Sequence, residues 1–206
     1  MTVIPAALFD FLADLRAHND TPWFHANKDR YERHVREPCR AFVRAVAPAM
    51  HRLGAEADDA RSGGSLAAQH RDRRFSPDGP PYWPHALVRF PVQGAGPRRL
   101  RPAFTLRIEA DGARVLAGLG DPGAELRRRI HDGMADPAWR RLRQRLDLDP
   151  GRMLHRPADD EDLRRRDFIA SVAVPKDTVI DEAFPRTFGR LCRDLAPLNR
   201  FLASRL

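Results

Sequence analysis

The segment Ala103–Leu119, AFTLRIEADGARVLAGL, decides the fold. It contains two stretches of strand-like residues, Ala103 to Ala110 and Ala113 to Leu119, which flank the pair Asp111-Gly112. An Asp-Gly pair between two such stretches is the strongest short-range signal for a β-hairpin. We therefore expect two antiparallel strands joined by a tight turn.

Outward from this hairpin, three more stretches have strand character: Ser65 to Phe75, Ala86 to Val92 and Phe168 to Val174. Together with the hairpin they predict one mainly antiparallel sheet of about five strands. Helices at the two ends of the chain have wide apolar stripes that a sheet would bury. The fold class that we expect is α+β, with N- and C-terminal helices covering one face of the sheet.

Helical spacing of apolar residues defines these helices. The first runs from about Pro5 to His18. Thr21 caps the second, whose apolar stripe stays in phase through Pro38, which indicates one kinked helix or two nearly coaxial ones. Asp121-Pro122 and Asp136-Pro137 each begin a shorter helix. The last helix carries an apolar stripe made of Phe184, Phe188, Leu191, Leu195, Leu198 and Leu202.

The chain has 206 residues, of which 42% are hydrophobic, and no linker-like segment divides it. We expect a single domain spanning residues 1–206. No apolar run approaches the length that crosses a bilayer, so we expect a soluble cytoplasmic protein with no membrane partner. Cys39 and Cys192 lie among apolar helical positions without metal-ligand spacing, which favours two buried free thiols.

The formal net charge of +8 permits nucleic-acid binding but does not establish it. Lys28 and Lys176 are the only lysines, and arginine is abundant together with alanine, glycine and proline. That pattern is typical of a GC-rich coding sequence. Most arginines alternate with acids; the one loop-like basic cluster, Pro97 to Arg101, is interpreted as a solvated loop in which Arg98→Ala costs little.

Gln69–His85, QHRDRRFSPDGPPYWPH, is the segment that most resembles a site. Asp72 and Arg74 share one face of the predicted strand, and Ser76 to Gly79 fit a rigid type I turn. We expect this corner to converge with the polar start of the second helix on one concave pocket for a phosphate or carboxylate. The candidate ligand-binding residues are Asp72, Arg74, Ser76, Asp78, Tyr82, His85, Asn19, Trp23 and Lys28.

Other motifs give weaker signals. Gly118 to Gly123 match G-x-G-x-x-G, the motif of dinucleotide-binding folds. However, the preceding strand belongs to a hairpin, and Asp121 would repel a pyrophosphate. We therefore interpret the motif as a tight strand-to-helix turn. His70 and Asp72 on one strand face are too few for a metal prediction, and Ser76 lacks the context of a nucleophile. We therefore predict no metal and no cofactor.

The order of these features resembles the domain of unknown function 2461 family over nearly the whole chain. The resemblance rests on Asn19, Trp23-Phe24, Lys28 and Tyr31, on the central segment from Arg71 to Tyr82, and on later positions such as Gly118, Gly120, Asp167-Phe168 and Leu195. It implies an α+β domain without an established activity. Gly79 stands where the family usually has lysine, and Ala68 and His70 stand where arginine and tyrosine are common.

Three hypotheses remain open at this point. The first is a pocket for a small anionic molecule, with or without catalysis, in which Arg74 acts as a bidentate donor oriented by Asp72. The second is a nucleic-acid or protein interaction module that uses arginines together with Trp23, Tyr82 and Trp83 as stacking surfaces. The third is a purely structural role, in which the corner only fastens the loop to the first helices. The oligomeric state is left open.

Overall fold

The structure is a computed structural model that describes residues 3–60, 63–72, 79–94, 97–146, 148 and 166–206. In chain order its elements are α1 (Ala6–Ala17), α2 (Thr21–Ala26), α3 (Lys28–Tyr31), the π-helical η1 (Glu32–Arg36), α4 (Glu37–Arg52), β1 (Ala86–Pro91), the 3-10 turn η3 (Arg98–Leu100), β2 (Ala103–Glu109), β3 (Gly112–Leu119), α5 (Ala124–Gly133), α6 (Pro137–Arg143), β4 (Phe168–Pro175), α7 (Lys176–Ile180) and α8 (Phe184–Ala203).

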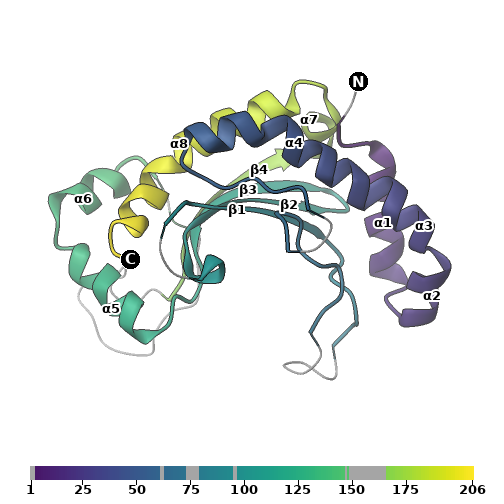
Figure 1. Ribbon diagram of the computed structural model, residues 1–206, viewed down its shortest axis with the longest axis horizontal. Helices are drawn as coiled ribbons and strands as arrows, with labels where there is room; N and C mark the ends of the chain where they lie inside the picture. Colours follow the sequence, from purple (N-terminus) through teal and green to yellow (C-terminus); the bar gives the residue numbers. More distant parts are fainter. Residues whose placement is uncertain (1–2, 61–62, 73–78, 95–96, 147, 149–165) are drawn as a thin grey trace.

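The strands form one antiparallel sheet in the order β1-β2-β3-β4, and α4 and α8 lie across one of its faces (Figure 1). Helices α1 to α3 stand at one end of the sheet, and α5 and α6 stand at the other (Figure 1). The predicted α+β class is thus confirmed, with one antiparallel sheet covered by N- and C-terminal helices. The prediction of about five strands is wrong by one, because the described residues form four.

The missing strand is the one predicted from Ser65 to Phe75. Its described part pairs with residues 82–88 through isolated bridges, from Leu66 to Val88 and from His70 to Tyr82, and not through a continuous ladder. Residues 80, 81 and 84 on the partner side are prolines, which have no N–H to donate to a ladder. The segment therefore follows β1 as an irregular edge and does not extend the sheet.

The hairpin between β2 and β3 is confirmed, but its turn is shifted by one residue. Glu109 pairs with Gly112, so the two-residue loop consists of Ala110 and Asp111. Gly112 belongs to β3, where a Cβ atom would lie 3.0 Å from the carbonyl oxygen of Val174 on β4. The glycine therefore serves close strand packing and does not supply a left-handed turn conformation.

The helix starts also differ in detail from the predictions. Asp20, and not Thr21, caps α2, because its carboxylate accepts a hydrogen bond of 2.8 Å from the Trp23 N–H. Helix α5 begins at Ala124, later than the predicted start at Asp121. The predicted cap of α6 at Asp136 is confirmed by a bond of 2.8 Å from the Ala138 N–H. A capping carboxylate satisfies an N–H that the helix itself leaves unpaired.

The predicted long second helix is a chain of helical segments. Helix α3 runs through the π-helical turn η1 into α4, and Pro38 lies in the first turn of α4. Proline has no N–H for the preceding turn, and a π turn is a common way to accommodate such an irregularity. The kink predicted near Pro38 thus corresponds to this local change of helix type.

The hydrophobic core lies between the sheet and the two long helices. Phe188 of α8 contacts Phe42 of α4 at 5.1 Å and Phe90 of β1 at 5.6 Å between ring centroids. Of the predicted α8 stripe only Leu191 is partly exposed, and the other members are buried. Cys39 and Cys192 are buried free thiols, as predicted, and burial raises the pKa of both.

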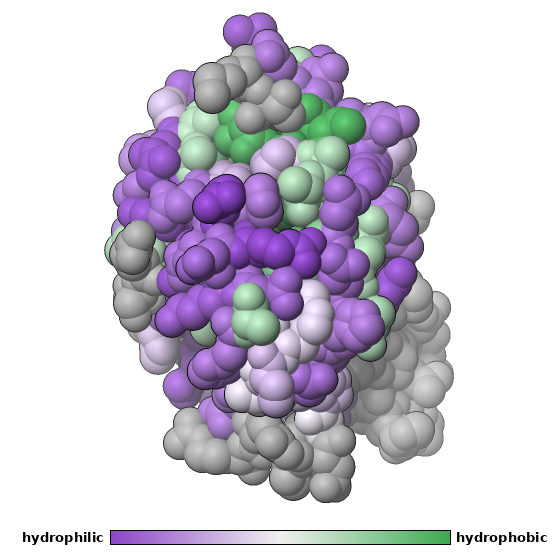
Figure 2. Space-filling view, turned by 90° about the vertical axis from the view of Figure 1, so that its right-hand side faces the viewer, coloured by the Kyte–Doolittle hydropathy of each residue, from purple (hydrophilic) through white to green (hydrophobic). Residues whose placement is uncertain are grey.

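The opposite face of the sheet is concave and, within the described part of the chain, carries no helix across it (Figure 1). The loop that precedes β1 descends on one side of this hollow, and the end of the molecule with α5 lies on the other (Figure 1). The end formed by α1 to α3 presents a mainly hydrophilic surface (Figure 2). Among the described residues, no helix is long and apolar enough to cross a membrane.

Candidate functional site

The loop that precedes β1 is fastened to the N-terminal helices at Asn19. The side chain of Asn19 accepts a hydrogen bond of 3.0 Å from the Tyr82 N–H and donates one of 2.9 Å to the Tyr82 carbonyl oxygen. The buried Tyr82 ring stacks on Phe24 with centroids 3.9 Å apart and planes 12° from parallel. The two segments therefore meet at Asn19 and Tyr82, and both groups are used in fastening the chain. The predicted convergence on an anion pocket also involves residues 73–78, which lie outside the described residues, and stays a prediction.

The remaining predicted corner residues fall into three groups. Trp23 is half-buried and packs against Phe11, with ring centroids 5.7 Å apart. Asp72 and Lys28 are exposed at the surface. Arg74, Ser76 and Asp78 lie outside the described residues, so their predicted roles in ligand binding stay predictions.

Trp83 is the exposed aromatic of the loop, with 38% of its surface accessible. The guanidinium of Arg71 lies 4.6 Å from the centre of its ring, and the His85 ring lies 5.4 Å away. A guanidinium on an indole face is a favourable cation–π contact. Gly79 makes room for it, because a Cβ atom there would lie 2.7 Å from an Arg71 nitrogen.

His85 stands at the edge of the concave face, one residue before β1. Partial burial and, to a smaller extent, the positive charge of Arg107 lower its pKa from 6.5 to about 4, although the negative charge of Glu109 opposes the change. The imidazole is therefore neutral at pH 7. It offers one N–H donor and one acceptor nitrogen to anything that binds beside it.

Strand alternation places a set of polar side chains on the concave face. Because successive strand residues point to opposite faces, Arg89 of β1, Arg107 of β2 and Arg114 of β3 share the face that His85 borders. Arg107 forms an ion pair of 2.6 Å with Glu109. Arg114 donates to the Ser171 hydroxyl at 2.6 Å. Arg89 differs from both, because its partners in the described chain are backbone carbonyl oxygens and not a side chain.

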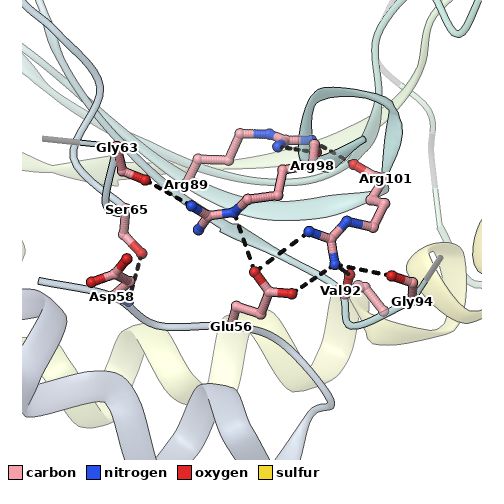
Figure 3. A network of polar contacts seen from close by, with 9 residues as sticks. All are labelled: Glu56, Asp58, Gly63, Ser65, Arg89, Val92, Gly94, Arg98 and Arg101. Carbon is pink, nitrogen blue, oxygen red and sulfur yellow. Dashed lines mark hydrogen bonds and ion pairs between the residues drawn. The ribbon is translucent and has the colours of Figure 1, made fainter. Parts of the chain in front are cut away.

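Arg89 is held by backbone oxygens. Its two terminal nitrogens donate to the carbonyl oxygens of Arg98 at 2.7 Å and Arg101 at 2.5 Å (Figure 3). These bonds fix the guanidinium against the η3 turn. Two of its five N–H groups are thereby used, which leaves three for a ligand.

The carboxylate that pairs with arginines in this network is Glu56 (Figure 3), whereas Asp58 bonds to the backbone N–H of Ala60. Glu56 accepts from Arg101 at 2.6 Å and lies 3.2 Å from the Arg98 side chain. Two arginines thus share one acid, and Arg89 is bound to the backbone of both. Burial lowers the pKa of Arg89, and the positive charges of Arg98 and Arg101 lower it further. The site therefore carries uncompensated positive charge, which an anion would neutralise.

The prediction that Pro97 to Arg101 form a solvated loop fits the exposed Pro97 and Arg99 but is wrong for Arg101. Arg101 is only 6% exposed, since its guanidinium is enclosed by Glu56 and by the carbonyl oxygens of Val92 and Gly94. Arg98 also donates to the Gly63 carbonyl oxygen at 2.7 Å. The buried Arg101 and the partly exposed Arg98 both bind groups outside the loop and hold the connection between β1 and β2 in place. Arg98→Ala removes an ion pair and a hydrogen bond, so we now expect it to lower stability.

A pocket of about 280 Å³ opens on the concave face beside Arg89. Its polar wall is formed by Arg89, Arg99, Thr105 and Arg107, and its apolar wall includes Leu87, Leu116 and Ile169. Glycines 118 and 120 complete the lining. A small concave site with an apolar wall and a few convergent polar groups is the usual form of a small-molecule site.

The glycine motif from Gly118 to Gly123 forms a tight strand-to-helix turn, as interpreted from the sequence. At Gly118 (φ 130°) a Cβ atom would collide with the Phe168 carbonyl oxygen, so only glycine fits. The Asp121 N–H donates to the Asp167 carboxylate at 2.9 Å. An internal acid thus takes a donor that a phosphate would need, and the preceding strand is antiparallel, which a dinucleotide fold does not have.

Among the described residues, no group of three or more histidine, cysteine or acidic side chains is arranged to hold a metal ion. His70, which shares a predicted strand face with Asp72 as a possible pair of metal ligands, is exposed. Its ring packs edge-on against the Tyr82 ring, with centroids 5.5 Å apart.

Sequence reasoning missed the arginines of the concave face, although a signal for them exists. In β1 and β2, arginine or threonine alternates with buried apolar residues, as in Val88-Arg89-Phe90 and Phe104-Thr105-Leu106-Arg107. That alternation predicts a polar sheet face. The carbonyl oxygens that hold Arg89 come from an irregular turn, which no periodicity predicts.

The arrangement is that of a small α+β domain with a cationic pocket on an open sheet face. A family model described as a conserved hypothetical protein, DUF2461, matches residues 7–201. The chain therefore belongs to the domain of unknown function 2461 family. No curated protein matches it. Asn19 and Tyr82, which belong to the two signatures behind the resemblance, are hydrogen-bonded to each other in the fold.

Proposed function

We propose that the protein binds a small anionic molecule, a phosphate ester or a carboxylate, in the pocket on the concave face of its sheet. The observation that carries this proposal is the state of Arg89. Its guanidinium is partly buried, fixed by two carbonyl oxygens and flanked by two further arginines, without a carboxylate of its own among the described residues. Uncompensated buried charge is costly, and a bound anion removes that cost.

The chemistry of the pocket suits such a ligand. The three free N–H groups of Arg89 are arranged in a rigid fork that matches the oxygens of phosphate or carboxylate. Arg99 and Arg107 add charge from the same lining, and Thr105 adds a hydroxyl group. Leu87, Leu116 and Ile169 give an apolar surface for the rest of the molecule. Binding alone accounts for these features, and catalysis is not required by them.

The test is calorimetry of the full chain with inorganic phosphate, pyrophosphate and citrate at low ionic strength. At least one of these anions is expected to bind, and Arg89→Lys is expected to weaken it about tenfold or more, because lysine keeps the charge but loses the fork. Arg107→Gln should weaken it less. Arg114→Gln is the matched control, since Arg114 lies on the same face outside the pocket lining.

Arg89→Lys also removes two bonds to the η3 turn, so its melting temperature must be compared with that of the wild type. If Arg89→Lys unfolds, Arg107→Gln against Arg114→Gln still decides the question. Equal affinities for these two variants, or binding of none of the anions to the wild type, would reject the pocket.

The residues predicted from the loop before β1 and from the N-terminal helices form a second part of the same binding site in this proposal. We propose that Asp72, Arg74, Ser76 and Asp78 of the loop, and Lys28 of α3, contribute to binding of the same ligand. Asn19 and Tyr82 position that loop through their hydrogen bonds, Trp23 packs on Phe11 among the N-terminal helices, and His85 borders the concave face. Asp72→Asn and Arg74→Lys should then lower the affinity for the same anion without a change at Arg89.

The alternative of a nucleic-acid module that stacks bases on Trp23, Tyr82 and Trp83 is less well supported. Tyr82 is 4% exposed and already stacked on Phe24, and Trp23 is half-buried. Base stacking needs accessible ring faces. Of the three rings, only Trp83 is substantially exposed, and Arg71 lies over its ring.

A further inference from the structure

A second concentration of arginines lies on the opposite side of the sheet, in a groove between α4 and α8. Its lining includes Arg52 at the end of α4 and Arg186, Arg190 and Arg193 on α8. The groove has a volume of about 640 Å³, and all four arginines are exposed. The two helices lie side by side over the sheet, far from the concave face (Figure 1).

The four arginines have no acidic partner among the described residues. This sets them apart from other surface arginines of the molecule, such as Arg30 and Arg128, which form ion pairs with Asp14 and Glu125. The one side-chain bond within the group runs from Arg190 to the Thr187 hydroxyl at 3.1 Å. No carboxylate belongs to the lining, so the groove surface itself is positively charged, although Glu182 and Asp194 flank the arginines along the chain.

The floor of the groove is rigid. A Cβ atom on Gly189 would lie 3.3 Å from the Ala49 methyl group, so glycine lets α8 approach α4 closely. Beneath this contact, Phe42 stacks on Phe184 at 5.5 Å and meets Phe188 edge-on. The arginines are therefore carried by two helices whose relative position is fixed by the core.

The spacing of the α8 arginines suits a repeating anion. Residues 186, 190 and 193 recur at steps of four and three, which places them on one helix face. At a rise of about 1.5 Å per residue, they span about 10 Å along the helix axis. Arg52 faces them from α4 across the groove. A single small anion would not reach all four, whereas a chain of phosphates would.

We propose that this groove binds the phosphate backbone of double-stranded nucleic acid without reading its sequence. The lining supplies cationic forks for phosphates and contains no aromatic ring on which an unpaired base could stack. Contacts of this kind carry no base information, and their affinity falls steeply with salt because each neutralised phosphate releases counterions.

The test is the salt dependence of binding to a short mixed-sequence DNA duplex, measured by fluorescence anisotropy. Four phosphate contacts predict that the slope of log K against log salt is about −3.6. The double variant Arg186→Gln, Arg190→Gln should make the slope shallower by about 1.8. A second duplex of different sequence should give the same slope.

The matched control is Arg30→Gln with Arg114→Gln, which removes the same charge from exposed positions outside the groove and should leave the slope unchanged. Circular dichroism of both double variants should match that of the wild type. Absence of duplex binding at low salt, an equal slope change in the control, or displacement of the duplex by polyglutamate at equal charge concentration would overturn the proposal. Loss of duplex binding would leave anion binding at Arg89 intact, because the two sites lie on opposite faces of the sheet.

Discussion

The two arginine regions differ in how the protein holds the charge. On the concave face, Arg89 is partly buried and bound by carbonyl oxygens, and its neighbour Arg101 is nearly enclosed around Glu56. In the groove between α4 and α8, Arg186 and Arg190 extend from a helix surface into solvent. The same residue type is thus fixed and desolvated on one side of the sheet, and free and hydrated on the other.

The difference indicates two kinds of recognition. A fixed guanidinium has already lost its conformational freedom and part of its hydration, so it favours one small ligand of matching geometry. An exposed arginine gains little from any single partner but adds to a long-range field that attracts polyanions. A cluster of arginines therefore predicts function only when burial and partners are known, and composition alone does not distinguish the two cases.

Phe188→Ala should have the largest effect, because Phe188 lies beneath the groove and behind β1. Its ring contacts Phe42, Phe90 and Phe184, and its loss leaves a cavity in a fully buried site. We expect a loss of about 3–5 kcal/mol in the free energy of unfolding. Denaturant titration measures it, with the exposed Val172→Ala as control. Similar values for the two variants would show that the helix does not rest on the sheet.

Glu56→Gln tests how the fixed arginines on the concave side are neutralised. It removes the acid that neutralises Arg101 and Arg98, so we expect a loss of about 1–3 kcal/mol in the free energy of unfolding. The site also becomes more positive, and added phosphate should then raise the melting temperature more than it does for the wild type. An unchanged response to phosphate would indicate that the anion does not bind near this network.

His85 provides a pH test of the concave side. Its pKa is about 4 in the folded protein and 6.5 without the fold, so the unfolded chain binds more protons between these values. Stability should be fully present above pH 6.5 and decrease as the pH falls toward 4. Because the ring is partly exposed, we expect the free energy of unfolding to fall by only about 1–2 kcal/mol over this pH range. His85→Gln should remove this part of the pH dependence, and an identical profile for the variant would contradict the assignment.

Arg186→Gln with Arg190→Gln should have the smallest effect on stability, within about 0.5 kcal/mol, because neither side chain is buried or ion-paired within the described structure. Thermal unfolding measures it against the wild type. A large destabilisation would mean that these arginines hold the two helices together, and the contrast between fixed and free arginines would then disappear.

The parts of the fold that the sequence predicts are those with local, periodic causes. The hairpin around Asp111, the strand from Phe168 and the α8 stripe follow from alternation or helical spacing, and all three are confirmed. The strand from Ser65 was predicted from its own alternation, whereas pairing depends on the partner, where prolines withhold N–H donors. Ladder formation is a property of two segments, and a pattern in one of them cannot ensure it.

The candidate site was predicted less well, because it depends on contacts between distant residues. The sequence predicts that the loop approaches the start of the second helix, but it does not predict that Asn19 binds both backbone groups of Tyr82. The network of Glu56, Arg89 and Arg101 joins a loop, a strand and an irregular turn. Nothing in the spacing of these residues indicates that an arginine side chain meets those carbonyl oxygens.

The most direct test of the central claim is the arginine Nε–H spectrum of ¹⁵N-labelled protein during titration with inorganic phosphate. The Arg89 signal, assigned by its loss in Arg89→Lys, is expected to shift and saturate, because phosphate binds at a fixed, partly buried fork. The groove arginines should shift weakly and in proportion to phosphate concentration. If Arg89 responds no more than Arg186 and Arg190 do, the concave face holds no anion site.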